Sequence, residues 1–144
     1  MNLGELLKKK GGGVETISPD GSIGDALKTL NEKHIGALIV MDAGGGVEGI
    51  ISERDLLKNC YNCSQDQKVS EFMTSKDKLE SLSPSDSLQQ AMQVFTEKRI
   101  RHLPIMEGAD LSGILSIGDA VKALLDAAEE ENKHLKEYIM GPNI

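Results

Sequence analysis

The stretch GIISERD at residues 49–55 returns as GILSIGD at residues 113–119. Both copies hold a glycine, two apolar residues and a serine, with an aspartate three positions after the serine. Upstream, ISPDGSIGDALKTLNEKHIGALIVM (17–41) aligns without a gap with LSPSDSLQQAMQVFTEKRIRHLPIM (82–106). The register slips by one residue in the next loop and resumes at the motif. The chain therefore contains a duplicated unit of about 60 residues, and such self-similarity predicts a repeat architecture.

Each copy of the unit has the pattern strand, helix, strand, strand, helix. The runs VETIS and LESLS precede a proline, as short strands often do. Capping-box spacing follows at Ser22 and at Ser87, and apolar residues then recur at helical spacing. ALIVM and HLPIM predict buried strands, VEGIIS and LSGILS predict the third strands, and a second helix begins at each Ser-x-x-Asp. We therefore expect an α/β (α+β) fold of two β-α-β-β-α repeats.

The two repeats are expected to form one body. A 60-residue unit buries only about 60% of its unfolded surface, so two units gain by sharing a core in a pseudo-twofold pair. The segment KVSEFMTSK between them is a short amphipathic linker. The expected divisions are an N-terminal segment (1–13), the first repeat (14–66), the linker (67–78), the second repeat (79–126) and a helical tail (127–144).

Composition narrows the classes of partner. The 144 residues are 39% hydrophobic and 27% charged, which is typical of a soluble globular protein, and the net charge is −7. A net negative charge argues against nucleic acid and against a membrane surface, because both bind cationic footprints. No apolar run approaches the ~20 residues of a membrane span. We expect a cytoplasmic protein with both cysteines as free thiols, or an organellar one whose targeting segment has been removed.

The duplicated motif, with its repeat and linker, resembles a family. Gly-apolar-apolar-Ser/Thr-x-x-Asp closing a β-α-β-β-α unit, found twice around a V-x-x-F-M-T linker, is similar to a pair of CBS domains, or Bateman module. The resemblance covers residues 14–126 and is closest to stand-alone bacterial and organellar CBS pairs. It implies a module without chemistry or required cofactor that binds AMP, ADP or ATP, or NAD(H) or S-adenosylmethionine, between the repeats. It also implies a disc-like homodimer and a regulated protein partner.

Two sites follow from the resemblance, each joining the Ser-x-x-Asp of one repeat to strands of the other. The first would use Ser52, Arg54, Asp55, Leu79, Glu80, Ile100, Arg101 and His102. The second would use Ser116, Asp119, Val14, Glu15, Ile35, Gly36 and Ala37.

Two roles are open for each Ser-x-x-Asp. In a nucleotide site, the unpaired N–H groups at a helix start suit a phosphate, and the carboxylate can accept both hydroxyls of a ribose. In a helix cap, the serine caps the first turn and the aspartate favours the helix dipole, as Ser22 and Asp25 are expected to do. Arg99, Arg101 and His102 form a local cationic group, which favours the first site for phosphates. A solvated surface cluster is the alternative.

Two further features have competing interpretations. Cys60 and Cys63 form a C-x-x-C that could be a redox pair or half a zinc site, but a second pair is absent and the motif falls late in a helix. In the tail, residues 121, 125, 128, 132, 135 and 139 follow the a/d spacing of a coiled coil. We expect this stripe to pack on the protein's own Leu3, Leu6 and Leu7, with a dimer contact as the alternative.

Three functions remain in competition. The first is a non-catalytic adenosine-nucleotide sensor, and the second is a ligand-free interaction or dimerisation module. A thiol enzyme is the third, and no Ser-His-Asp arrangement, Walker loop or metal cluster in the sequence supports catalysis.

Overall fold

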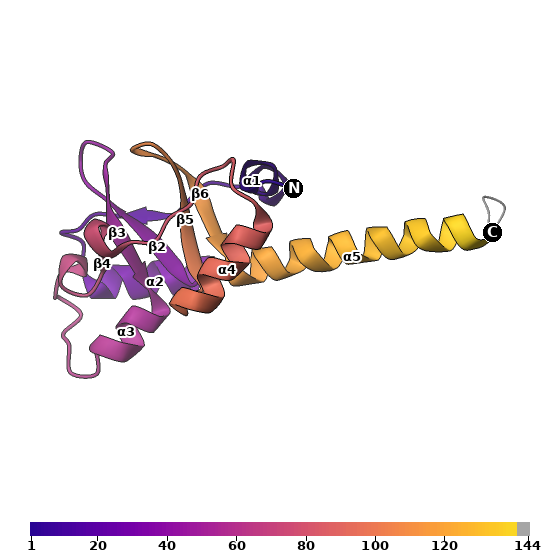
Figure 1. The fold of residues 1–144 in the computed structure, drawn as a ribbon. Coiled ribbons are helices and arrows are strands. Elements are labelled where there is room, and N and C mark those ends of the chain that lie inside the picture. Colours follow the sequence, from indigo (N-terminus) through magenta and orange to yellow (C-terminus); the bar gives the residue numbers. More distant parts are fainter. Residues whose placement is uncertain (141–144) are drawn as a thin grey trace.

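The computed structural model describes residues 1–140 and contains both expected repeats (Figure 1). The first repeat consists of β1 (Thr16–Ile17), α2 (Ile23–Lys33), β2 (Ala37–Met41), β3 (Val47–Ser52) and α3 (Glu53–Asn59). The second consists of α4 (Leu88–Lys98), β5 (His102–Glu107), β6 (Asp110–Ser116) and α5 (Ile117–Met140). The helix α1 (Leu3–Lys10) precedes the first repeat, and the linker between the repeats holds η1 (Val69–Glu71), β4 (Thr74–Ser75) and η2 (Lys76–Lys78). The predicted mixed α/β fold class is confirmed.

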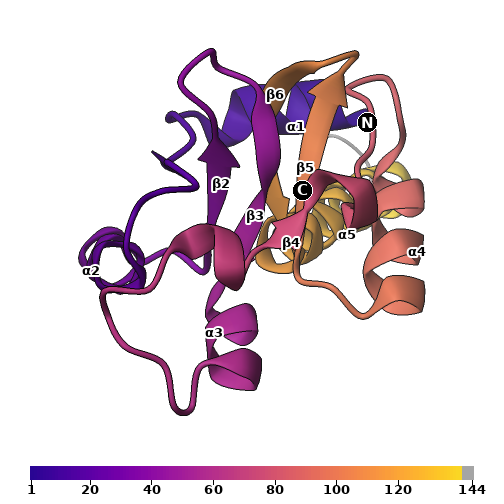
Figure 2. The same ribbon diagram turned by 90° about the vertical axis from the view of Figure 1, so that its left-hand side faces the viewer.

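The strands form two sheets that lie side by side in the middle of the molecule (Figure 2). One sheet has the order β1-β2-β3-β4, with β1 and β2 parallel and the other pairs antiparallel. The other sheet is the antiparallel pair β5-β6. Between the two, Ala37, Ile39 and Ile50 pack with Leu111 and Ile114 of the second repeat. The two repeats therefore share an apolar junction, as the small size of each unit requires.

Pro104 explains why the first strand of the second repeat is almost absent. In the first repeat, the N–H of Ile39 donates to the carbonyl of Glu15 at 3.2 Å, beside the β1–β2 ladder. Pro104 aligns with Ile39 and has no N–H to donate to Glu80. The expected strand at 79–83 is thereby reduced to a single parallel bridge between Leu82 and Ile105.

Each repeat is completed by the segment that precedes the other repeat. The N–H groups of Leu3 and Gly4 donate to the carbonyls of Asp86 and Pro84 at 2.9 Å. In the same way, Val69 and Ser70 in the linker donate to Gly21 and Pro19 at 2.8 and 3.1 Å. The N-terminal segment and the linker are therefore structural equivalents that cross over to the opposite repeat.

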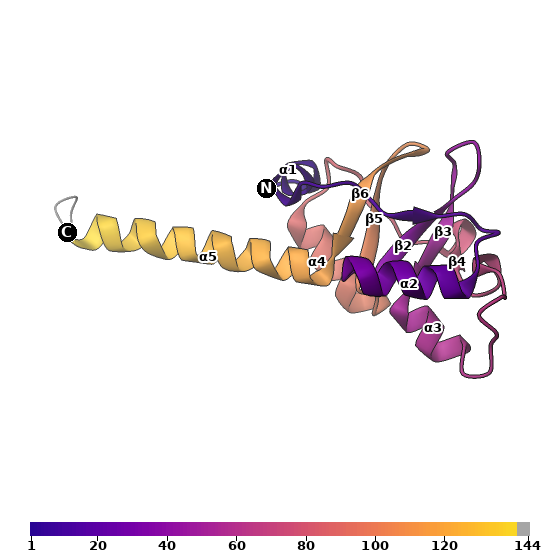
Figure 3. The same cartoon turned by 180° about the vertical axis from the view of Figure 1, so that it is seen from behind.

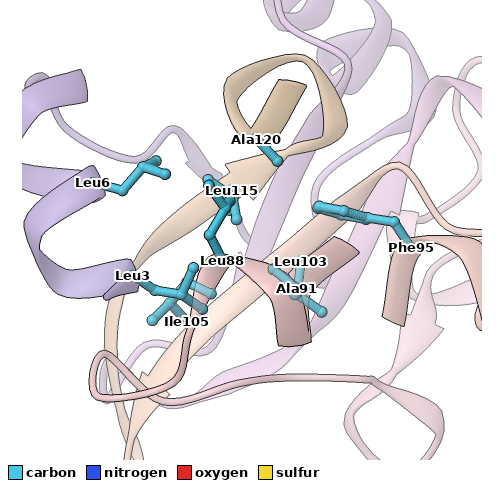
Figure 4. Close-up of a cluster of buried hydrophobic side chains, with 9 residues drawn as sticks. All are labelled: Leu3, Leu6, Leu88, Ala91, Phe95, Leu103, Ile105, Leu115 and Ala120. Carbon is cyan, nitrogen blue, oxygen red and sulfur yellow. The ribbon is translucent and has the colours of Figure 1, made fainter. Parts of the chain in front are cut away.

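The crossing segments contribute to the two main cores. Leu3 and Leu6 of α1 are buried against Leu88, Leu115 and other residues of the second repeat (Figure 4). Val69 of the linker is fully buried in the equivalent core of the first repeat. Burial of one such side chain contributes about 1.5–3 kcal/mol, so removing either segment would uncover a core.

The helix starts follow the predicted capping pattern. The side chains of Ser22 and Ser87 accept hydrogen bonds from the N–H groups of Asp25 and Gln90 at 3.0 and 3.1 Å. The role expected for Ser22, a plain cap, agrees with this geometry.

Two expectations are wrong. Cys60 and Cys63 form a disulfide and are not free thiols, because the turn at the end of α3 brings their Cα atoms within 4.8 Å. The tail does not fold back as a whole onto α1. Only the start of α5 packs there, through Ala120 and Ala123, and the helix then continues straight outward (Figure 1). Residues 141–144 of the expected tail lie outside the described residues.

Among residues 1–140, no helix combines the length and apolar character needed to cross a membrane.

Candidate functional site

A pocket with a volume of about 420 Å³ lies between the two repeats, within the usual range for small-molecule sites. All eight residues expected in the first site line it: Ser52, Arg54, Asp55, Leu79, Glu80, Ile100, Arg101 and His102. Seven further residues complete the lining: Gly36, Ile50, Glu53, Leu57, Thr74, Lys78 and Arg99. The structure thus brings together side chains from β3, α3, the linker and the approach to β5.

Ser52 and Asp55 form a capping box at the start of α3. The Ser52 hydroxyl accepts a hydrogen bond from the Asp55 N–H at 3.1 Å, and Asp55 Oδ2 accepts one from the Ser52 N–H at 2.9 Å. The hydroxyl also lies 3.0 Å from Oδ2. Ser52 and Asp55 therefore do cap α3. The cap uses Asp55 Oδ2, and Oδ1 takes no part in it.

Thr74 faces the second oxygen of this carboxylate. Its hydroxyl lies 3.4 Å from Asp55 Oδ1, and both residues line the pocket. Thr74 was not among the expected site residues, although the linker motif that contains it was recognised. Thr74 could have been found only by knowing that the linker packs against the first repeat, where β4 pairs with β3.

The pocket is cationic in an acidic protein. Arg54, Lys78, Arg99 and Arg101 line it, against the carboxylates of Glu53, Asp55 and Glu80. The guanidinium of Arg54 donates to the Arg99 carbonyl at 2.9 Å, which links α3 to the end of α4. Arg99 adopts a left-handed conformation with φ 55°, so its carbonyl turns away from the helix axis. This cluster gives an anion a local positive environment despite the net charge of −7.

His102 is held close to the backbone of the opposite repeat. A Cβ at Gly36 would lie 2.8 Å from both Cε1 and Nε2 of the His102 ring, so only glycine leaves room for the ring. Burial lowers the pKa of His102 below its ordinary value, and the Glu53 carboxylate opposes this shift. The ring is therefore neutral at pH 7 and offers one N–H and one acceptor nitrogen, instead of the added positive charge that the sequence suggested.

Part of the pocket lining is apolar. Ile50 is buried in β3, Leu79 and Ile100 are half-buried, and Leu57 of α3 is 83% exposed. Apolar side chains together with a few polar and charged groups are the usual lining of a small-molecule site.

The second Ser-x-x-Asp has a different surrounding. The Ser116 N–H donates to Asp119 Oδ2 at 3.0 Å, and the Asp119 N–H donates to the Ser116 hydroxyl at 3.0 Å. Lys10 at the end of α1 then places its ammonium 2.8 Å from Asp119 Oδ2 and 2.9 Å from the Ile114 carbonyl. Ile114 aligns with Ile50, which lines the pocket of the first site.

The Lys10 contact changes the electrostatics of Asp119. Burial acts to raise the pKa of this carboxyl, but the hydrogen bond and charge of Lys10, with the Ser116 hydrogen bonds, hold it below its ordinary value. Asp119 is therefore an ionised carboxylate whose charge is already matched by an ammonium. Asp55 has no such cationic partner within salt-bridge distance among the described residues.

The five first-repeat residues of the second expected site do not line the pocket that contains Asp119. The pocket of about 480 Å³ that contains Asp119 is lined by α1, α4 and α5, and it includes neither Ser116 nor the five first-repeat residues. Gly36 lines the first pocket instead. Val14 and Ala37 pack in the junction between the repeats, and Ile35 packs against the core of the first repeat. Glu15 pairs loosely with Lys33 at 4.0 Å.

No group of three or more His, Cys, Asp or Glu side chains in residues 1–140 has the arrangement of a metal site.

Comparisons with known proteins agree with this architecture. The family model for the CBS domain matches the chain twice, over residues 6–62 and 69–126. CBSX3, a mitochondrial CBS domain-containing protein of Arabidopsis thaliana, is 33% identical over 148 residues, which cover 96% of this chain and 72% of that protein.

Two solved structures extend the comparison. The crystal structure of a CBS-domain containing protein from Agrobacterium tumefaciens is 42% identical, with a TM-score of 0.79 over 85% of this chain and 98% of that one. The crystal structure of CBSX2 in complex with AMP is 26% identical, with a TM-score of 0.73 over 88% and 98% of the two chains.

Proposed function

The chain belongs to the CBS-domain family, and from this premise we propose that it is a non-catalytic regulatory module that binds an adenosine nucleotide, AMP in the first place. The observation that carries the proposal is the pocket between the repeats, whose lining combines the Asp55 carboxylate, four cationic side chains and several apolar side chains. The CBSX2 structure with AMP supports this ligand class in a related protein.

Each part of the nucleotide has a matching group in the pocket. Oδ1 of Asp55, next to Thr74, accepts hydrogen bonds from the ribose hydroxyls. Arg54, Arg99 and Arg101 with Lys78 bind the phosphate, because guanidinium groups pair with phosphate oxygens in a bidentate way. Ile50, Leu79 and Ile100 contact the adenine ring through its apolar faces.

The α3 helix itself has little left to offer the phosphate. It has 7 residues, and the Ser52 side chain already accepts the Asp55 N–H at its start. The proposed phosphate contacts are therefore made by side chains, and these can reach one phosphate or several. ADP, ATP and NAD(H) are accommodated on this basis, whereas S-adenosylmethionine brings a sulfonium cation toward a cationic cluster and is disfavoured.

We assign one nucleotide to each chain. Lys10 holds the carboxylate of Asp119 and the carbonyl of Ile114, the groups that correspond to Asp55 and Ile50 in the proposed site. The ammonium contacts Asp119 Oδ2, the oxygen that also accepts the Ser116 N–H, so a ribose at Asp119 would meet a carboxylate whose charge a neighbouring cation already balances.

The regulatory output follows from the shared lining. Arg54 and Asp55 come from the first repeat, whereas Arg101 and His102 come from the second, so a bound nucleotide ties the two repeats together. The ligand can shift their relative arrangement only by its differential affinity for the two states, typically about 1–3 kcal/mol. A partner protein that contacts both repeats would read that shift.

Calorimetric titration of the purified protein tests the proposal, with AMP, ADP, ATP, NADH and S-adenosylmethionine as separate ligands. We expect AMP to bind with a stoichiometry of one per chain, and Arg101→Ala to weaken it. Asp66→Asn, an exposed carboxylate outside the pocket, is the matched control. Absence of binding by all five ligands would overturn the proposal and favour the ligand-free interaction module.

A further inference from the structure

The helix α3 projects from the body, and the chain after it turns back toward the linker (Figure 3). Cys60 follows the last residue of α3, and its N–H donates to the Leu56 carbonyl at 2.9 Å. Cys60 and Cys63 form a disulfide across this turn. Both are half-buried against the core of the first repeat, whereas Tyr61 between them is 85% exposed. The disulfide therefore lies at a surface turn that a reagent in solution can reach.

The segment after the disulfide is anchored independently of α3. The N–H of Gly24 donates to the Gln65 carbonyl, and the N–H of Ile23 donates to the Gln67 carbonyl, both at 2.9 Å. These bonds attach residues 65–67 to the start of α2. The disulfide thus ties the C-terminal end of α3 to a fixed part of the first repeat.

Few other contacts hold α3 in place. It has 7 residues, of which only Leu56 is buried, while Leu57 is 83% exposed. Helices this short are marginal unless packing or caps stabilise them. The capping box of Ser52 and Asp55 holds the N-terminal end, and the disulfide lies next to the C-terminal end. Opening the disulfide would therefore loosen the last turn of α3 first.

The pocket between the repeats takes residues from both sides of the disulfide. Arg54, Asp55 and Leu57 line it from α3. Thr74 and Lys78 line it from the linker, and the Thr74 hydroxyl lies 3.4 Å from Asp55 Oδ1. The disulfide is a covalent link between these two segments. A change at the end of α3 therefore changes how the two sets of residues lie relative to each other.

The spacing of the two cysteines distinguishes this disulfide from a structural one. A disulfide stabilises a fold mainly by constraining the unfolded chain, and this effect grows with the length of the closed loop. With a sequence separation of 3, the pair closes a very short loop and contributes little of that kind. Exposed disulfides are also the more easily reduced ones. We therefore expect the body to stay folded when this disulfide opens.

The position of the pair in the helix decides its part in an exchange reaction. In disulfide oxidoreductases, the attacking thiol of a C-x-x-C lies at a helix N-terminus, which favours its thiolate. Cys60 instead follows the end of α3. The pair is therefore suited to be reduced and reoxidised by another thiol compound, and not to act as the attacking group itself.

We propose that Cys60 and Cys63 are a reversible redox site for an external dithiol, and that their disulfide holds α3 in the form that binds nucleotide. A thiolate of the dithiol attacks one sulfur, the Cys60–Cys63 bond breaks and a mixed disulfide forms. The second thiol of the reagent then displaces the cysteine and closes the reagent's own disulfide. Two electrons and two protons thus pass from the dithiol to the two cysteines, and exchange with an external disulfide reverses the reaction.

Thiol counting in the folded protein tests reversibility. The chain is equilibrated with mixtures of reduced and oxidised dithiothreitol, quenched with acid and alkylated, and its mass gives the number of thiols. We expect a two-electron transition from the disulfide to 2 thiols per chain, with a folded body by circular dichroism at both ends. Reduction that occurs only in denaturant would identify a structural disulfide and contradict the proposal.

Hydrogen exchange without ligand tests the effect on α3. Amides in the last turn of α3 should exchange faster in the reduced protein and in the double variant Cys60→Ser/Cys63→Ser, and those of β2 and β3 should not change. Asn62→Ala, which alters an exposed residue of the same turn, is the matched control and should respond to reduction like the wild type. Equal exchange of α3 in the oxidised and reduced protein would overturn the proposal.

Calorimetric titration with AMP tests the coupling to the pocket, which rests on the function proposed above. The reduced protein and the double serine variant should bind AMP about three- to tenfold more weakly than the oxidised protein, because part of the population lacks the binding form. The serine variant should also be insensitive to dithiothreitol. Equal affinity in both redox states would refute the coupling. Binding in neither state would count against the nucleotide function, and hydrogen exchange then decides the redox site.

Discussion

The ammonium of Lys10 forms a salt bridge of 2.8 Å with Asp119, the aspartate of the second repeat motif. The equivalent aspartate of the first repeat has a threonine hydroxyl nearby instead of a cation, because Thr74 lies 3.4 Å from Asp55. The two contacts come from segments that cross over in the same way, α1 in one case and the linker in the other. The pseudo-twofold body is thus asymmetric at the two positions where a ribose could bind.

Removing the Lys10 side chain should open the second position. Lys10→Ala leaves the Asp119 carboxylate and the Ile114 carbonyl without the ammonium, while α1 keeps its buried contacts through Leu3 and Leu6. We expect the stoichiometry of AMP in calorimetric titration to rise from one to two per chain. Lys8→Ala, an exposed lysine of the same helix, should keep it at one. A stoichiometry of one in Lys10→Ala would show that Lys10 does not block the site.

The two aspartates should differ in what their loss does. Asp55→Asn keeps the size and the capping ability of the side chain but removes its charge. Since hydrogen bonds to a charged group contribute about 1.5–3 kcal/mol, AMP affinity should fall roughly 10- to 100-fold. Asp119→Asn should leave AMP affinity unchanged and lower thermal stability, because it removes the partner of Lys10. Equal losses of affinity in both variants would contradict the assignment of a single site.

Much of the fold could be predicted because the information is present twice. A helix cap at Ser22 supports the one at Ser87, and the same register relates the strands that follow. The nearly missing strand before Pro104 could not be predicted from pattern alone. The strand is lost because the missing N–H of Pro104 would have faced residues 79–83. Which segment an N–H faces is known only once the sheet is assembled.

The lining of the pocket between the repeats could be predicted for the same reason, whereas the Lys10 contact at Asp119 could not. The eight expected residues of the first site lie in or next to strands and helices that the repeat predicts. The packing of the two repeats therefore brings these residues to one pocket. At the second site the decisive residue is Lys10, which belongs to a helix outside the repeat. Its sequence, GELLKKK, predicts a helix but not the strand that the helix crosses. The same holds for the distal part of α5, where an a/d pattern cannot say whether the covering surface is the protein's own.

Gly36 should be intolerant of any side chain, although its backbone conformation is not left-handed. A Cβ there would lie 2.8 Å from the His102 ring, so Gly36→Ala must push the imidazole toward the pocket. We expect AMP affinity to fall on the order of tenfold and stability to fall by about 1–3 kcal/mol, the usual cost of overpacking. Gly13→Ala, where the added methyl meets open space, is the control and should change neither quantity. An unaltered affinity in Gly36→Ala would mean that the position of His102 does not matter for binding.

The pH dependence of stability should carry the signature of His102. Burial lowers the pKa of this residue in the folded protein, with Glu53 and Asp119 opposing the shift and Lys10 and Arg101 adding to it. Between the ordinary pKa of 6.5 and the lower folded value, the unfolded chain binds a proton that the folded protein does not. The free energy of unfolding should therefore fall as pH drops below 6.5, by at most about 1.4 kcal/mol per pH unit, the value for one proton.

Denaturant unfolding at a series of pH values from about 7.5 to about 5, the range in which histidines titrate, measures this slope. In His102→Asn the amide cannot titrate, so this part of the slope should disappear. An identical slope in the variant would show that His102 gains its proton as readily in the folded protein as in the unfolded chain.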